Sequence, residues 1–173
     1  MTEIDIVKPT EPTFYFFPLN ERAQTVIKHG FSLKQLWAFR PITALNIFYG
    51  ALQEGSSNQD LHDWGLNVSS TLAQIEGLSG VSLPPADEVI IPTEITVHAL
   101  KKYHTTQSGK ETIDFAQRVA RLAQLDHIDS SSLLIGSVFA AQGDFRSLLR
   151  RNGLTPRAFV YGKGSTAAST PQE

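Results

Sequence analysis

Apolar residues recur at helical spacing along most of this chain, and short polar or glycine-containing breaks separate the apolar segments. In the first half, helices are predicted to begin at Asn20, Thr43, Asn58 and Asn67, because each of these polar residues can cap the helix that follows it. The segment after Thr43, ALNIFYGALQE, is apolar around nearly its whole circumference. Such a segment is typical of a central, buried helix.

The same order of segments occurs a second time in the second half of the chain. The landmarks are Ile42, Gly50, Gly55 and Gly65 in the first copy, and Ile128, Gly136, Gly143 and Gly153 in the second. Internal repeats of helical size determine the architecture of a fold. The pattern predicts an all-α protein of about eight helices, with two pseudo-symmetric four-helix repeats packed into one domain around a shared core.

Two details of the helices are also predicted from the pattern. Gly30 is expected to interrupt the first helix, which Ser32 can then restart. The first long helix of the second copy is expected to bury the larger apolar residues along its length. These are Phe115, Val119, Leu122 and Ala123.

The composition of the segments between the helices indicates the limits of the domain. Residues 1–15 are predicted to form an extended N-terminal arm, and residues 162–173 a disordered tail. Between them, repeat one spans 16–77 and repeat two 92–161. A linker rich in Gly, Ser and Pro, residues 78–91, separates the repeats. The aromatic residues at 14–17 fit either a strap packed on the core or an exposed binding patch.

Bulk properties exclude several classes of protein. The chain has 173 residues, a net charge of −2 and no cysteine. The charge gives no argument for binding nucleic acid or a membrane surface, and the lack of cysteine removes disulfides and thiol chemistry. No apolar run reaches the length of a membrane span, and the acidic start does not fit a secretory signal. We predict a cytoplasmic protein, with a processed organellar form as the alternative.

Several stretches resemble the repeat of the Clp N-terminal domain. LNERAQTVI at 19–27 is similar to the opening of that repeat, F-T-x-R-A-x-x-V-L. ITALNIFYGALQEG at 42–55 and IDSSSLLIGSVFAAQG at 128–143 are both similar to I-x-x-E-H-L-L-L-G-L-L-x-x-G. The SLPP at 82–85 and the IP at 91–92 resemble the linker between the two repeats. The resemblance covers about residues 16–161.

This resemblance implies a protein-binding function and no enzyme activity. In Clp/Hsp100 unfoldases the domain binds substrates and adaptor proteins ahead of ATPase modules, but no G-x-x-x-x-G-K-[ST] motif occurs here. We therefore expect a cofactor-free accessory or adaptor-like protein whose partners are Clp ATPase or peptidase subunits, adaptors or substrate polypeptides. The alternatives are the N-terminal domain of a larger Clp ATPase and, more distantly, a small helical enzyme.

The sequence departs from the family pattern at one functional position. Where the family has Glu-His, this chain has Leu45-Asn46 in the first copy and Ser131-Ser132 in the second. Some relatives use those glutamates to recognise phosphorylated arginine. Because a guanidinium is held best by carboxylates, the departure argues against that activity here.

Two groups of residues are candidate partner-binding sites. By the resemblance, Phe16 and Leu19 match the opening of the first repeat, and Thr93 and His98 are placed at the comparable positions of the second. From the residues themselves, Arg146 and Arg150 form a basic helix face with Arg157 nearby. That face is either a solvated surface or a docking site for an acidic partner.

Other candidate chemistry is weak. The five histidines lack the spacing of metal ligands, and no G-x-S-x-G nucleophile motif occurs in the sequence. We therefore predict neither a metal site nor a catalytic site.

Overall fold

The computed structural model describes residues 17–36, 42–79, 96–97 and 105–161. Within these ranges the elements are helices, and strand-like pairing is limited to two isolated bridges. The helices are α1 (Glu21–Leu36), α2 (Ala44–Glu54), α3 (Asn58–Asp63), α4 (Val68–Ser79), α6 (Gln107–Leu122), α7 (Ser130–Phe139), α8 (Gly143–Arg151) and α9 (Pro156–Tyr161). The predicted all-α fold is confirmed.

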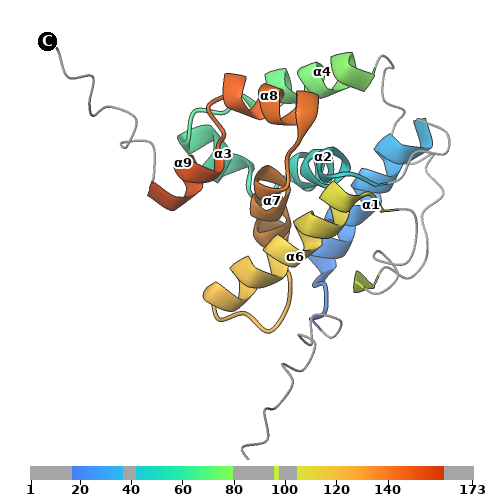
Figure 1. The fold of residues 1–173 in the computed structure, drawn as a ribbon, viewed down its shortest axis with the longest axis vertical. Helices are drawn as coiled ribbons and strands as arrows, with labels where there is room; N and C mark the ends of the chain where they lie inside the picture. The colour runs from blue at the N-terminus through green and yellow to red at the C-terminus, as the bar shows by residue number, and fades with distance from the viewer. Residues whose placement is uncertain (1–16, 37–41, 80–95, 98–104, 162–173) are drawn as a thin grey trace, which may run out of the picture.

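The two central helices of the repeats pack against each other. Figure 1 shows α2 and α7 in the middle of the molecule, with the other helices around them. Helix α1 packs on α2, and α6 packs on α7. The buried apolar residues of both repeats form one cluster, which includes Phe48 from α2 and Phe145 from α8 with their ring centroids 5.3 Å apart. The hydrophobic core is therefore shared between the repeats.

Each of the four long inner helices begins at a polar side chain that accepts a hydrogen bond from the backbone three residues later. The Ala23 N–H donates to Asn20 Oδ1 over 2.9 Å at α1, and the Ser132 N–H donates to Asp129 Oδ1 over 2.8 Å at α7. Thr43 and Thr106 cap α2 and α6 in the same way. These bonds satisfy N–H groups that have no partner inside the helix, which is why the helices start at these residues.

Two short bridges join the beginning of each repeat to the other repeat. Leu19 pairs with Ile128, and Ile42 pairs with Thr105. The same shift relates the members of both pairs (105 − 19 = 86 and 128 − 42 = 86). The two repeats therefore exchange equivalent contacts around a pseudo-twofold axis, and Thr105 is the structural counterpart of Leu19.

Helix α1 runs without a break through Gly30, contrary to the prediction from sequence. A Cβ built at Gly30 would lie 2.9 Å from the Asn46 carbonyl oxygen. The Asn46 side-chain amide also donates to the Gly30 carbonyl oxygen over 3.3 Å. The glycine allows α1 and α2 to approach closely, and the hydrogen bonds of α1 on either side of it keep the helix continuous.

The buried face of α6 also differs from the prediction. The helix buries Ile113, Ala116 and Ala120, whereas Leu122 is 86% exposed and Phe115 is only partly buried. The cause is the close packing of α6 on α7, which requires small side chains at the contact. A Cβ at Gly136 of α7 would lie 2.4 Å from the Thr112 carbonyl oxygen. The larger apolar residues lie on the flank of the helix instead, where the Phe115 ring meets the Phe139 ring at 5.5 Å.

Candidate functional site

The residues predicted at the openings of the repeats lie in different surroundings. Leu19 is 7% exposed, and its backbone is part of the bridge to Ile128. Its side chain therefore belongs to the shared core. Phe16, Thr93 and His98 lie outside the described residues. The bridges relate the two repeats by a shift of 86 residues, so Thr105 is the described residue of the second repeat that corresponds to Leu19.

A polar cluster lies where the end of α2 meets the start of α7. The Glu54 carboxylate accepts hydrogen bonds from the Ser130 hydroxyl at 2.7 Å and from both the hydroxyl and the backbone N–H of Ser56. Close by, the hydroxyls of Ser57 and Ser131 are 3.1 Å apart. Ser131 stands at one of the positions where the family pattern has glutamate. The serines of α7 therefore contribute to the junction between the repeats.

Hydrogen bonds, burial and neighbouring charges shift the pKa values of Glu54 and His29 at this junction. Burial alone raises the pKa of Glu54, but the hydrogen bonds from Ser56 and Ser130 and the charge of Arg22 outweigh it, so the pKa lies below its usual value. Burial lowers the pKa of His29, against the opposing charge of Glu54. At neutral pH Glu54 is thus ionised, and its Oε2 already accepts three hydrogen bonds. We assign this cluster a structural role.

Arg146 and Arg150 line a groove between the C-terminal end of α7, helix α8 and the start of α9. We call it the arginine groove. Its volume is about 490 Å³, and Arg157 from α9 also lines it. All three arginines are exposed. The apolar residues at its base are buried and come from α7, from α8 and from the turns that follow these two helices. They are Val138, Ala141, Leu149 and Leu154.

The amphipathic pattern of α8 places its charges at this groove. Phe145, Leu148 and Leu149 are buried in the core, and Arg146 and Arg150, which lie off this buried face, are exposed. They are four residues apart and hence neighbours on one helix face. Within the described part of the chain, no acidic side chain lines the groove. The arrangement combines positive charge at the rim with an apolar base.

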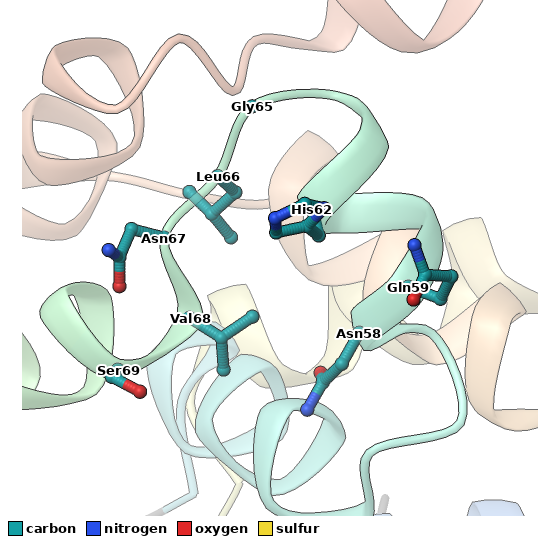
Figure 2. A pocket seen from close by; sticks show the side chains of 8 residues that line it. All are labelled: Asn58, Gln59, His62, Gly65, Leu66, Asn67, Val68 and Ser69. Atoms are coloured by element: carbon teal, nitrogen blue, oxygen red, sulfur yellow. The ribbon is translucent and has the colours of Figure 1, made fainter.

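A second groove lies between α3 and α4, and sequence reasoning did not anticipate it. Figure 2 shows Asn58 and His62 from α3, Leu66 from the turn, and Val68 from the first turn of α4 around this opening. Its volume is about 460 Å³. Its side chains are polar or apolar and carry no arginine or lysine. No run of charge marked it in the sequence.

The described residues contain neither a cluster of metal ligands nor a membrane-spanning helix. No group of three or more histidine, aspartate or glutamate side chains there is arranged to hold a metal ion. No described helix combines the length and the apolar character that crossing a membrane requires.

Comparison with known proteins defines the class of the fold. No protein-family profile and no curated protein matches this sequence. Solved structures do match. A chain from structural investigations of a malarial protein secretion system has a TM-score of 0.61 and 13% sequence identity, over 82% of this chain and 89% of that one.

A second matching structure names the domain. The crystal structure of the N-terminal domain of the caseinolytic protease-associated chaperone ClpD from Arabidopsis thaliana has a TM-score of 0.57 and 15% identity, over 88% of this chain and 94% of that one. At these identities the match defines the fold and leaves the function open. This chain has the fold of a Clp N-terminal domain, as the resemblance of its repeats predicted.

Proposed function

We propose that this chain is a non-enzymatic protein-binding module that modulates a Clp chaperone–protease, by docking on the complex or by capturing its substrates. The main support is the match of nearly the whole chain to a Clp N-terminal domain, that of ClpD. The arginine groove supplies a surface for such binding. Exposed arginines around an apolar base are typical of protein interfaces, in which arginine is enriched.

The role in the cell follows from the predicted location. In the cytoplasm, the partners would be Clp ATPase or peptidase subunits, their adaptors or their substrates. A binding module needs neither cofactor nor metal, and its effect on proteolysis would come from competition or delivery. Its own surface would carry out no reaction.

Affinity capture from native lysate at near-native concentration tests this function. The chain is tagged, captured and analysed by mass spectrometry, next to a variant with Arg146→Glu and Arg150→Glu. We expect Clp ATPase or peptidase subunits in the capture with the unaltered chain and a strong reduction with the variant. Recovery of no Clp subunit by the unaltered chain would overturn the proposal.

A second candidate is the N-terminal domain of a larger Clp ATPase. It is favoured by the ClpD match, because that chain is itself an N-terminal domain and the match covers 94% of it. The binding surface would be the same in both cases. The length of the native transcript separates the two candidates, since only the larger protein requires coding sequence for ATPase modules.

A further inference from the structure

The arginine groove and the α3–α4 groove occupy equivalent places in the two repeats. One shift relates their lining residues (146 − 58 = 88, 150 − 62 = 88 and 154 − 66 = 88). The backbone follows the same path in both. Leu66 donates its N–H to the Leu61 carbonyl oxygen over 2.9 Å, and Leu154 donates to the Leu149 carbonyl oxygen over 2.9 Å.

The turns and caps of the two grooves agree as well. The glycine before each of these leucines has a positive φ, 80° at Gly65 and 75° at Gly153. The following helix is capped by Asn67 in one groove and by Thr155 in the other, each accepting from the N–H three residues later. The α3–α4 groove and the α8–α9 side of the arginine groove thus share one backbone and can be compared position by position, whereas Val138, Phe139 and Ala141 line the arginine groove alone.

The copies differ in charge at three equivalent positions. Arg146, Arg150 and Arg157 in one groove correspond to Asn58, His62 and Ser69 in the other. The leucine at the base is buried in both, with 2% of Leu66 and 3% of Leu154 exposed. The backbone is therefore the same in both grooves, but three arginines line one groove and no arginine lines the other.

We infer that the arginine groove binds an acidic peptide segment of a partner protein, and that the α3–α4 groove does not bind it. Carboxylates of the segment pair with the guanidinium groups of Arg146 and Arg150, and an apolar side chain packs on the base of the groove. This inference rests on the proposed function, because it names the kind of partner that the module captures.

Charge and shape favour a peptide over other anions. Guanidinium groups bind carboxylates in a forked geometry that a lysine cannot reproduce. The volume of about 490 Å³ lies in the range of ligand sites. A nucleic acid needs a wide basic surface, whereas this chain has a net charge of −2 and the groove has an apolar base. A free phosphate would leave that base unused.

Peptide titration with the full chain tests the inference. The probe is a fluorescein-labelled peptide of alternating glutamate and leucine, and fluorescence anisotropy measures its binding. The comparison probes replace glutamate by glutamine or leucine by serine, and inorganic phosphate and single-stranded RNA serve as competitors. We expect the Glu–Leu peptide to bind tightest and its affinity to fall as salt is added.

Exchanging residues between the grooves gives matched variants. Arg146→Asn with Arg150→His copies the residues of the α3–α4 groove, and we expect it to weaken binding about tenfold or more, since each charge-assisted hydrogen bond is lost. The control removes two arginines outside the groove, Arg118→Gln with Arg151→Gln, and is expected to change affinity by less than about twofold. Circular dichroism melting verifies that both variants are folded.

A further variant places arginines in the α3–α4 groove. In the chain that carries Arg146→Asn and Arg150→His, the added changes Asn58→Arg and His62→Arg are expected to restore part of the binding, because the α3–α4 groove lacks the apolar residues that α7 contributes to the arginine groove. Equal loss in the control variant, or equal binding of the Glu–Leu and Gln–Leu probes, would overturn the inference. So would equal binding of the Glu–Ser probe, or phosphate or RNA binding more tightly than the peptide.

The outcome separates the inference from the proposed function. If Clp subunits are captured from lysate while no acidic peptide binds the groove, the module function stands and the assignment of the groove is wrong. If the peptide binds and no Clp subunit is captured, the groove assignment stands and the Clp connection is wrong.

Discussion

Gly50 of α2 lies at the close contact with α1, and Gly136 of α7 lies at the close contact with α6. A Cβ at Gly50 would lie 2.0 Å from the Val26 carbonyl oxygen, and one at Gly136 would lie 2.4 Å from the Thr112 carbonyl oxygen. Both distances are far below van der Waals contact, and the obstructing atom is backbone in each case. These two positions require glycine because a neighbouring helix occupies the space of the side chain.

Replacing these glycines by alanine is therefore expected to destabilise the protein. The α1–α2 or α6–α7 pair would have to move apart, and we expect each of Gly50→Ala and Gly136→Ala to cost at least about 2 kcal/mol of unfolding free energy. Gly77→Ala is the control. Among the described residues, a Cβ at Gly77 meets no atom within 4 Å outside its chain neighbours and the backbone of its own helix, and Gly77 is exposed in α4. There alanine should stabilise the protein by up to about 0.5–1 kcal/mol. Urea unfolding measures all three changes, and equal effects would contradict this account.

Gly30 shows what the sequence could and could not predict at the residue scale. The pattern correctly marked Gly50 and Gly136 as equivalent landmarks, but it predicted a break at Gly30. A glycine in a helical sequence is compatible with a break or with a close contact to another helix. Only the position of the second helix distinguishes these two, and that position depends on residues far along the chain.

Helix α6 shows how packing changes the buried face of an element. The large apolar residues Phe115 and Leu122 suggested one inward face, but the close approach of α7 buries the small residues of the neighbouring face. The arginine groove depends on a similar separation of a buried and an exposed face in α8. The apolar residues of α8 are buried, and Arg146 and Arg150 are exposed. In α8 the sequence predicted the exposed face correctly because its apolar and basic residues separate clearly.

Two alanine substitutions on α6 test this assignment of its faces. Ile113 is 1% exposed and Leu122 is 86% exposed. We expect Ile113→Ala to lower the unfolding free energy by about 2–5 kcal/mol through the loss of buried methyl groups and the cavity left behind. Leu122→Ala should change it by less than about 0.5 kcal/mol. Thermal melting of both variants measures the difference, and a larger loss for Leu122→Ala would mean that this face is buried.

At the scale of the whole molecule, the two repeats depend on each other. Helices α2 and α7 form a common core, the exchanged bridges connect both openings, and the Asn152 amide of the α8 cap donates to the Gln74 side chain of α4 over 3.0 Å. Figure 1 shows α4 and α8 side by side. Each repeat therefore needs the other to bury its apolar residues.

We therefore expect the described helices to unfold as one cooperative unit. In native-state hydrogen exchange, the most protected amides of α2 and α7 should exchange with the same free energy of opening. Ile113→Ala, although it lies in the second repeat, should reduce protection in both helices equally. A loss confined to α6 and α7 would show instead that the repeats open separately.

The sequence predicted the duplication, the central helices and the class of fold, because all three depend on apolar periodicity and glycine positions. It also marked Arg146 and Arg150. It did not reveal that Asn58 and His62 occupy the same places in the other repeat, although the landmark glycines Gly65 and Gly153 carry the same shift. The side chains at those positions share neither charge nor shape, so only the common backbone relates them.

The exchanged bridges also have a consequence for how the protein is made. Leu19 pairs with a residue 109 positions later in the chain (128 − 19 = 109). At a synthesis rate of about 5–20 residues per second, that partner leaves the ribosome about 5–20 s after Leu19 does. During this interval the face of α2 that α7 will cover stays exposed to water. A nascent first repeat is therefore expected to be prone to aggregation until the second repeat emerges and covers this face.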